Sequence, residues 1–138
     1  MTTSTNLENL VSALNELSTL IHDRNVKAGW WTDIKTGETL LGKDEYGRDR
    51  RNVPELLCLV HSEVSEAMEG YRKKLNDDKL PHRSMFEVEL ADVFIRIFDI
   101  AGAHKLDLAG AVFEKLEYNV NREDHKIENR KGANGKDF

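Results

Sequence analysis

Apolar residues recur every three or four positions along four stretches of the 138-residue chain, and this spacing is typical of amphipathic helices. The first stretch predicts a helix from Thr5, which has capping-box spacing to Glu8, to about Lys27, and Gly29 follows as a terminator. The second stretch predicts a helix over roughly 54–75 that begins with a proline, a residue favoured in the first helical turn. Long helices are therefore expected on both sides of a glycine-rich segment.

Two further helices are predicted in the second half of the chain. Ser84 and Glu87 have capping-box spacing at the start of a third helix over 85–103. Asp107 can cap a fourth helix that reaches roughly Glu123. The sequence thus predicts an all-α fold in which four helices hold most of the chain.

The segment between the first two helices, residues 32–52, lacks a helical period. The pair Thr36-Gly37 offers a turn there, so we expect either an irregular excursion or a short hairpin. The end of the chain, residues 127–138, is expected to be irregular. The predicted organisation is one domain over 1–126 followed by this tail.

The charge balance narrows the range of partners. With 20 Lys and Arg against 25 Asp and Glu the formal charge is −5, so the chain lacks the positive field that binding of DNA or RNA polymers requires. It has 33% charged residues and no run of about 18 apolar positions, which predicts a soluble protein without a membrane span. The single cysteine, Cys58, excludes an internal disulfide, and the N-terminus lacks a secretory pattern, so we expect a cytoplasmic location.

Acidic residues interrupt the apolar pattern of the second and third predicted helices. On the third helix the polar residues fall within roughly 80° of arc, a narrow notch on an otherwise apolar helix. They are Glu89, Asp92, Arg96 and Asp99. On the second helix Glu63 and Glu66 are three positions apart and share one face. Two acidic pairs that face one interior space are tolerated mainly when divalent cations neutralise them, and oxygen ligands alone favour Mg²⁺ or Mn²⁺.

The same spacings also have an ordinary interpretation. In a chain with 33% charged residues, acidic pairs arise on solvated helix faces or in salt bridges, for example between Asp92 and Arg96. A diiron bundle is another metal option, but it normally needs Glu-x-x-His pairs, and no His follows a Glu by three positions. A magnesium or manganese site is therefore the metal hypothesis to test.

Basic and amide side chains share one face of the fourth predicted helix. Lys115, Asn119 and Arg122 follow one another at spacings of four and three positions. A guanidinium can chelate two phosphate oxygens and an ammonium acts as a point charge, so this face suits phosphate, although an ordinary exposed face gives the same pattern. Tyr118 adds either a hydroxyl donor or a core residue.

Together these motifs resemble those of the MazG-like, all-α nucleoside triphosphate pyrophosphohydrolases. The signature of that family is ExxE, a spacer and ExxD, which here is Glu63-Val64-Ser65-Glu66 followed by Glu89-Leu90-Ala91-Asp92. The likeness continues through ELADVFIRIFDIAG and the K-x-x-Y-N-x-x-R segment that starts at Lys115, and less clearly back to IHDRNVKAGWW. It covers most of the chain except the excursion at 32–52.

The resemblance implies Mg²⁺- or Mn²⁺-dependent hydrolysis of a (d)NTP between its α and β phosphates, which gives a nucleoside monophosphate and pyrophosphate. The implied metal ligands are Glu63, Glu66, Glu89 and Asp92. Glu63 and Glu66 are equal candidates for the base that accepts a proton from the attacking water. The triphosphate would be positioned by Lys115, Asn119 and Arg122, and the nucleobase would be contacted by His22, Trp31 and Tyr118. Trp31 fits a core position equally well.

The apolar third helix favours assembly into a homodimer or homotetramer, and the resemblance implies a four-helix bundle completed by a neighbouring chain. Two other classes of function share this fold. A helical interaction module would need no metal, whereas a nucleotide-binding sensor would bind Mg²⁺ and an NTP without turnover. Within the enzyme class, an alarmone or modified-nucleotide hydrolase would have the same metal site.

Overall fold

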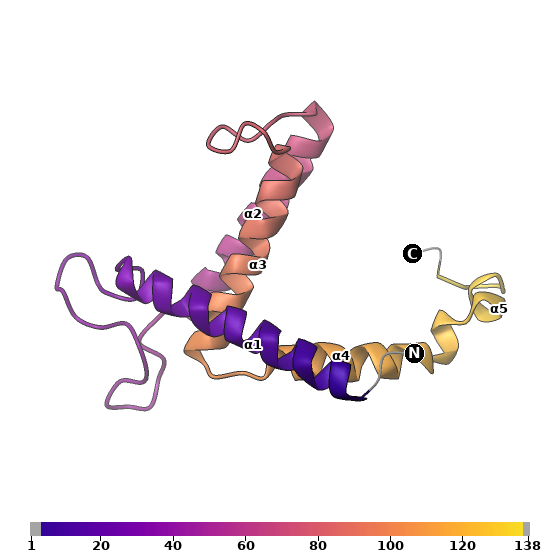
Figure 1. Ribbon diagram of the computed structural model, residues 1–138, viewed down its shortest axis with the longest axis horizontal. Helices are drawn as coiled ribbons and strands as arrows, with labels where there is room; N and C mark the ends of the chain where they lie inside the picture. Colours follow the sequence, from indigo (N-terminus) through magenta and orange to yellow (C-terminus); the bar gives the residue numbers. More distant parts are fainter. Residues whose placement is uncertain (1–3, 137–138) are drawn as a thin grey trace. The chain divides into compact units, whose positions relative to one another are not determined.

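The computed structural model describes residues 4–136, with side chains from Asn6 onward. Within this range the chain is all-α, as predicted, and contains isolated β-bridges but no β-strand. The elements are α1 Ser4–Lys27, α2 Val53–Lys73, α3 Met85–Ala103, α4 Leu108–Val120, the 3-10 helix η1 Glu123–His125 and α5 Ile127–Arg130 (Figure 1). None of the described helices is both long enough and apolar enough to cross a membrane.

Two compact units divide the described residues. Glu16–Leu106 form one unit, which contains the C-terminal part of α1, the excursion, α2 and α3. Residues 4–15 and 107–136 form the other. In the first unit α2 and α3 lie side by side and run in opposite directions (Figure 1). In the second, the tail that we expected to be irregular contains one helical turn, α5.

Capping side chains fix the helix boundaries close to the predicted positions. Asn52 accepts a hydrogen bond from the Glu55 backbone N–H at 3.2 Å, so α2 begins one residue before Pro54. Ser84 accepts from the Glu87 N–H at 3.1 Å, so α3 has its predicted bounds. The α1 helix begins at Ser4 and includes Thr5, whose predicted capping side chain lies outside the described residues.

Two helix ends differ from the prediction. The α2 helix ends at Lys73 because Lys74 has left-handed backbone angles, with φ 54°, and its N–H turns back to carbonyls of the last turn. Asp107 caps α4 as expected, accepting from the Gly110 N–H at 2.9 Å. The α4 helix nevertheless ends at Val120, so Arg122 lies beyond the helix, in an extended conformation with ψ 124°. The prediction that the fourth helix includes Arg122 is therefore wrong.

Close backbone approaches at two glycines position the helices of the first unit. A Cβ at Gly70 of α2 would lie 2.8 Å from the Met85 Cγ, at the start of α3. A Cβ at Gly102 of α3 would lie 2.6 Å from the His22 Cβ on α1. Nearby, the Ser18 hydroxyl of α1 donates to the Phe98 carbonyl of α3 at 2.7 Å. The missing side chain at Gly102 thus lets α1 bring His22 against α3.

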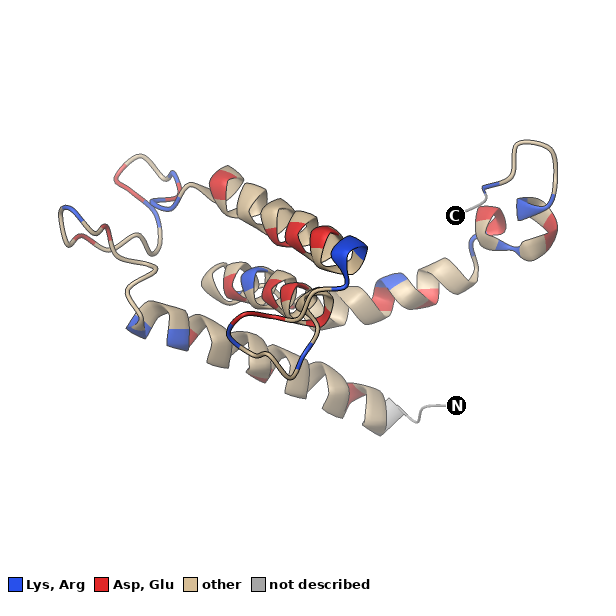
Figure 2. Ribbon diagram, turned by 90° about the horizontal axis from the view of Figure 1, so that it is seen from above, with Lys and Arg blue, Asp and Glu red and all other residues tan. Residues whose placement is uncertain are grey.

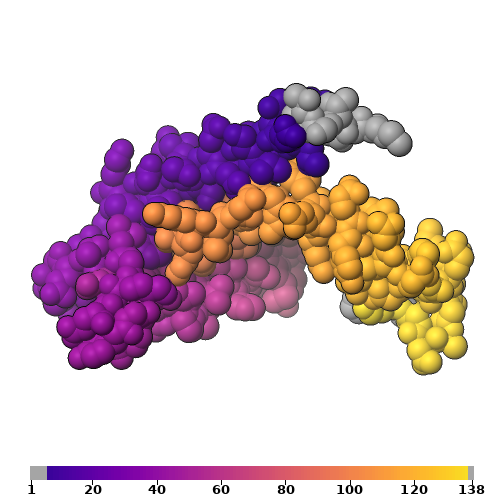
Figure 3. All heavy atoms as spheres, turned by 90° about the horizontal axis from the view of Figure 1, so that it is seen from below, coloured from indigo at the N-terminus to yellow at the C-terminus, as the bar shows by residue number. Residues whose placement is uncertain are grey.

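The excursion consists of tight turns. A single antiparallel bridge joins Thr32 to Thr39, and a second joins Lys43 to Asp49. Asp33 and Asp44 each start a turn by accepting hydrogen bonds from backbone N–H groups two to four residues later, at 2.8–2.9 Å. The segment therefore forms isolated bridges and not the hairpin that was the alternative. Its atoms are the purple spheres in Figure 3.

Large apolar side chains remain exposed on both α2 and α3. On α2 they follow one helix face at spacings of seven, four and three positions: Leu57, Val64, Met68 and Tyr71. On α3 they follow a face at spacings of four, four and three: Phe86, Leu90, Phe94 and Ile97. We call these the exposed apolar faces of α2 and α3. Such faces on neighbouring helices are typical of surfaces that another apolar surface covers.

Candidate metal centre

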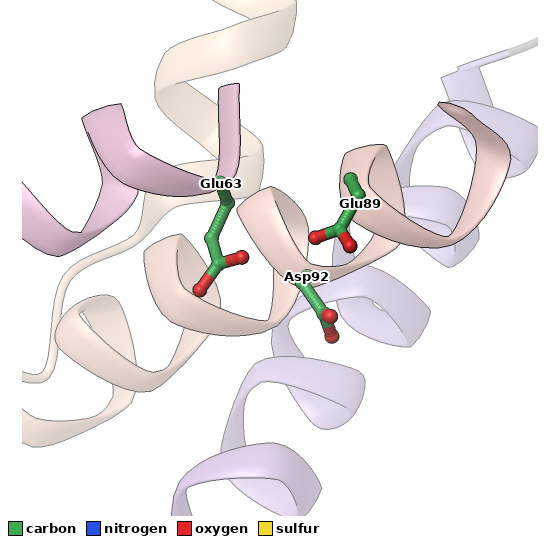
Figure 4. A group of neighbouring side chains, drawn as sticks. All are labelled: Glu63, Glu89 and Asp92. Atoms are coloured by element: carbon green, nitrogen blue, oxygen red, sulfur yellow. The ribbon is translucent and has the colours of Figure 1, made fainter. Parts of the chain in front are cut away.

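Three carboxylates converge between α2 and α3. Glu63 comes from α2, and Glu89 and Asp92 come from successive turns of α3 (Figure 4). One oxygen from each residue lies within 4.8 Å of the other two. Glu63 and Glu89 are both buried, each with 8% of its surface exposed. We call this group the acidic triad, and it brings together three of the four residues proposed from sequence as metal ligands.

The fourth proposed ligand, Glu66, lies outside the triad and its side chain is exposed. It lines a cavity of about 610 Å³ that all three members of the triad also line, which we call the acidic cavity. Six acidic residues line this cavity against one basic residue, Lys79. The concentration of acidic positions along α2 and α3 is visible in Figure 2. The acidic cavity thus joins all four proposed ligands in one space.

The loop between α2 and α3 supplies the other acids of this cavity. Asp77 is buried, and its Oδ1 accepts hydrogen bonds from the backbone N–H groups of Lys79 at 3.0 Å and Leu80 at 2.6 Å. These bonds hold the loop in a tight turn beside the triad. Helical periodicity and spacing did not identify this loop as part of the site. The sequence feature that could have identified the loop is the pair Asp77-Asp78, which follows the helix that carries Glu63 and Glu66.

The environment of the triad favours a proton or a cation. Burial raises the pKa of Glu89 from 4.5 to about 7, and its hydrogen bond with Glu63 and repulsion by Glu66, Glu63 and Asp92 add to the effect. Burial and the Glu63 charge also raise the pKa of Asp92, against the opposing attraction of Arg96. Near neutral pH the triad therefore carries negative charge that its own surroundings do not fully compensate.

One guanidinium provides partial compensation. Arg96 of α3 donates from Nε to the Glu63 Oε1 at 2.6 Å, a pair that joins α3 to α2. The spacing in sequence had suggested Asp92, four positions earlier, as its salt-bridge partner. The difference follows from packing, because the neighbouring helix presents Glu63 closer to the guanidinium than the same helix presents Asp92. Arg96 thereby orients one member of the triad.

Another acidic residue of α3, Asp99, has a different environment. It accepts hydrogen bonds from His22 Nδ1 at 2.7 Å, from Asn25 Nδ2 at 2.8 Å and from the Trp31 indole Nε1 at 3.0 and 3.2 Å. Asp99 and Trp31 are buried, and the His22 ring meets the Trp31 ring edge-on with centroids 5.2 Å apart. Two of the three side chains proposed to contact a base, His22 and Trp31, are therefore neighbours, and Asp99 holds both of them.

A cavity of about 390 Å³ adjoins the triad on this side, and we call it the tryptophan cavity. Its polar lining includes Arg51 and Asp99, and Leu56, Leu59 and Ile95 give it apolar walls. Trp31 lines it, as do Glu63 and Asp92, which also line the acidic cavity. Two members of the triad therefore face both a strongly acidic space and one with mixed polar and apolar walls, whose volume is in the range of small-molecule sites.

The proposed phosphate-binding residues belong to the other unit. Lys115 and Tyr118 contact each other on α4, with the Lys115 ammonium 4.5 Å from the centre of the Tyr118 ring. The Asn119 Oδ1 is buried and has no hydrogen-bond partner among the described residues. Arg122, past the end of α4, makes a two-point ion pair with Asp124 at 2.7 and 3.0 Å. This pair lowers the pKa of Asp124.

Comparisons with protein-family models, with curated proteins and with solved structures found no match.

Proposed function

We propose that the chain is a metal-dependent nucleoside triphosphate pyrophosphohydrolase of the MazG-like type. The reaction would convert a (d)NTP and water into a (d)NMP and pyrophosphate. The observation that carries the proposal is the acidic triad, in which three carboxylates converge although burial raises the pKa of Glu89 to about 7. A purely structural role gives no reason to keep such a repulsive group together.

The donor set fits a hard divalent cation. Glu63, Glu89 and Asp92 offer only oxygen atoms, and Glu66 lines the same cavity. Oxygen donors favour Mg²⁺ or Mn²⁺ over softer metals. A bound cation of this kind neutralises phosphate charge and lowers the pKa of a water molecule that attacks phosphorus. The six acids of the acidic cavity also require such neutralisation before a triphosphate can enter.

Glu63 and Glu66 are the two candidates for the general base that accepts a proton from the attacking water, and their contacts favour Glu66. Glu63 is committed to Arg96 at 2.6 Å, which keeps its oxygen in a fixed ion pair. Glu66 is exposed and lines the acidic cavity, so it is free to accept a proton from a water molecule in that space. We therefore assign Glu63, Glu89 and Asp92 to metal binding and Glu66 to proton transfer.

The remaining proposed contacts distribute the substrate over the two cavities. Phosphates would occupy the acidic cavity, and Lys115, Asn119 and Arg122 stay proposed phosphate contacts. The base would occupy the tryptophan cavity beside Trp31, with His22 held by Asp99 next to it. Tyr118 stays a proposed base contact.

Assembly is the second part of the proposal. The exposed apolar faces of α2 and α3 support a homodimer, or a homotetramer, in which a second copy covers them and completes a four-helix bundle. The largest exposed side chains there, Tyr71 at 68% and Phe94 at 61%, are costly to leave in water. The cytoplasmic location and the absence of nucleic-acid polymer partners stay predictions from composition.

The test is pyrophosphate release from a panel of NTPs and dNTPs with Mg²⁺, with Mn²⁺ and with EDTA. We expect metal-dependent turnover that Glu66→Gln lowers by about 100-fold or more, since loss of a general base costs 10²–10⁴-fold. Glu69→Gln is the matched control, because Glu69 is on the same helix but pairs with Arg72 and Lys73.

Four outcomes would contradict parts of this proposal. Folded protein that binds Mg²⁺-NTP without any turnover would be a nucleotide sensor, and protein that binds neither metal nor nucleotide would be a helical interaction module. Turnover only of an alarmone or a modified nucleotide would keep the metal site and change the substrate. An undiminished rate in Glu66→Gln would remove that residue from the chemistry.

A further inference from the structure

Arg51, the last but one residue of the excursion, lacks the partners that its neighbours have. Arg48 pairs with Asp44 at 2.8 Å, and Arg50 donates from Nε to the Lys43 carbonyl at 2.9 Å. The Arg51 Nε is buried and has no hydrogen-bond partner among the described residues. Since a buried donor without a partner loses its hydration, a ligand that supplies acceptors there would recover the lost free energy.

The position of Arg51 connects it with the proposed substrate site. Arg51 lines the tryptophan cavity together with Glu63 and Asp92 of the acidic triad. Asn25 and Trp31, which line the same cavity, donate to Asp99, and the Arg96 Nε donates to Glu63. Arg51 therefore brings to this cavity a buried donor that a ligand can use.

The shape of a guanidinium restricts which ligand group it recognises. Its Nε–H and one Nη–H point the same way, so it forms a fork that prefers two adjacent acceptors. Guanine presents such a pair as N7 and O6, and cytosine presents one as N3 and O2. Adenine places an amino group next to its N7 acceptor, and uracil and thymine place an N–H between their carbonyls. These edges leave one arm of the fork without an acceptor.

We propose that Arg51 determines base preference in the tryptophan cavity and selects guanine and cytosine nucleotides. The inference rests on the proposed function in one respect, since it takes the phosphates to lie at the acidic triad. The apolar walls formed by Leu56, Leu59 and Ile95 suit the faces of a base, and Arg51 supplies the contact to its edge. A site built around a hydrogen-bonding group rejects ligands that leave the group unpaired.

The test separates recognition from turnover by measuring both. Binding of dGMP, dCMP, dAMP and dTMP is followed by calorimetry in EDTA, and kcat/KM is measured for the four dNTPs with Mg²⁺. We expect dGMP and dCMP to bind about tenfold tighter or more than the other two, a difference in the range of one two-point base contact. Arg51→Lys keeps the charge but removes the fork, so it should abolish this difference in both measurements.

Control variants distinguish a contact of Arg51 with the base from a contact of Arg51 with phosphate. Arg50→Lys should retain the wild-type preference, because Arg50 is bound to the Lys43 carbonyl. Arg51→Gln is the second variant, with circular dichroism as the check of folding for both changes at Arg51. Equal weakening of all four nucleotides would assign Arg51 to phosphate and overturn the proposal, as would a preference that survives both variants.

The two hypotheses fail in different ways. Base-selective, Arg51-dependent binding without pyrophosphate release would overturn the hydrolase assignment and leave the base contact intact. Turnover of all four dNTPs at similar kcat/KM would uphold the hydrolase and overturn the role of Arg51.

Discussion

The α3 helix carries two acidic groups with opposite surroundings. Asp99 receives hydrogen bonds from three donors, on His22, Asn25 and Trp31. Glu89 and Asp92, on the same helix, face another carboxylate, Glu63, and the only guanidinium paired with this triad among the described residues is that of Arg96. Burial is similar, at 9% exposure for Asp99 and 8% for Glu89. What differs is the number of donors that satisfy each carboxylate.

This difference separates a structural acid from a binding group. A buried carboxylate whose lone pairs are filled by fixed donors has no capacity for a ligand, and its loss disrupts the fold. A buried carboxylate surrounded by others has unfilled lone pairs and excess charge, so removing it relieves repulsion. Substitutions at the two places should therefore change stability in opposite directions.

The largest effect is expected at Asp99. Asp99→Asn replaces one acceptor oxygen by an amino group that faces other donors, so we expect the free energy of unfolding to fall by roughly 4 kcal/mol, as for a buried pair that loses one partner. Chemical denaturation at pH 8 measures this. Asp92→Asn is the matched control on the same helix, and it should leave stability unchanged or raise it. Equal losses in both variants would contradict the distinction between the two groups.

The second effect is a dependence of stability on pH at the triad. In the folded chain the pKa of Glu89 is about 7, against 4.5 for an ordinary glutamate. Between these values the folded state keeps a proton that the unfolded state has lost, so stability falls as pH rises from about 4.5 through about 7. With 1.36 kcal/mol per pKa unit, the fall amounts to about 3 kcal/mol. Thermal unfolding across pH 4 to 9 without divalent cations measures it.

Glu89→Gln provides the control for this prediction. The variant carries no titrating group at this position, so its stability should vary much less over the same window and exceed that of the wild type at pH 8. Mg²⁺ takes the place of the proton, so it should raise the Tm of the wild type more at pH 8 than at pH 5. A Mg²⁺ effect of the same size in Glu89→Gln would show that the cation binds elsewhere.

Local patterns predicted the helices and the acidic pairs because both depend on neighbours in sequence. Apolar periodicity and the capping residues Ser84 and Asp107 placed the starts of α3 and α4 to the residue. The spacing of Glu63 with Glu66, and of Glu89 with Asp92, identified the helix faces that converge. For the site, these spacings identified the three members of the acidic triad and Glu66, but not the loop acids Asp77 and Asp78 that also line the acidic cavity.

The contacts that distinguish the two acids depend on packing between distant segments, which spacing does not encode. The donors to Asp99 come from 68 to 77 positions away, and they meet it because Gly102 lets α1 approach α3. Arg96 likewise pairs with Glu63, 33 positions away, although Asp92 is its neighbour at i−4. The unpaired Arg51 Nε is visible only once its surroundings are folded.

The smallest effect is expected at Gly102, where the close approach of α1 can be tested directly. A methyl group there would meet the His22 Cβ at 2.6 Å and the Ser18 carbonyl oxygen at 3.1 Å. We expect Gly102→Ala to lower the free energy of unfolding by about 2 kcal/mol, since overpacking costs 1–3 kcal/mol. It should also change the intrinsic fluorescence, because displacement of His22 disturbs the Asp99 contact with Trp31.

The sign of this effect is decisive because helix propensity acts in the other direction. At an open helical position, Gly→Ala stabilises by roughly 0.5–1 kcal/mol. The exposed Ala91 of α3 gives the matched reference: Ala91→Gly measures the propensity difference in this helix without a contact from α1. If Gly102→Ala stabilises the protein by as much as Ala91→Gly destabilises it, then α1 does not press on α3 at this point. The arrangement of donors around Asp99 would then need another cause.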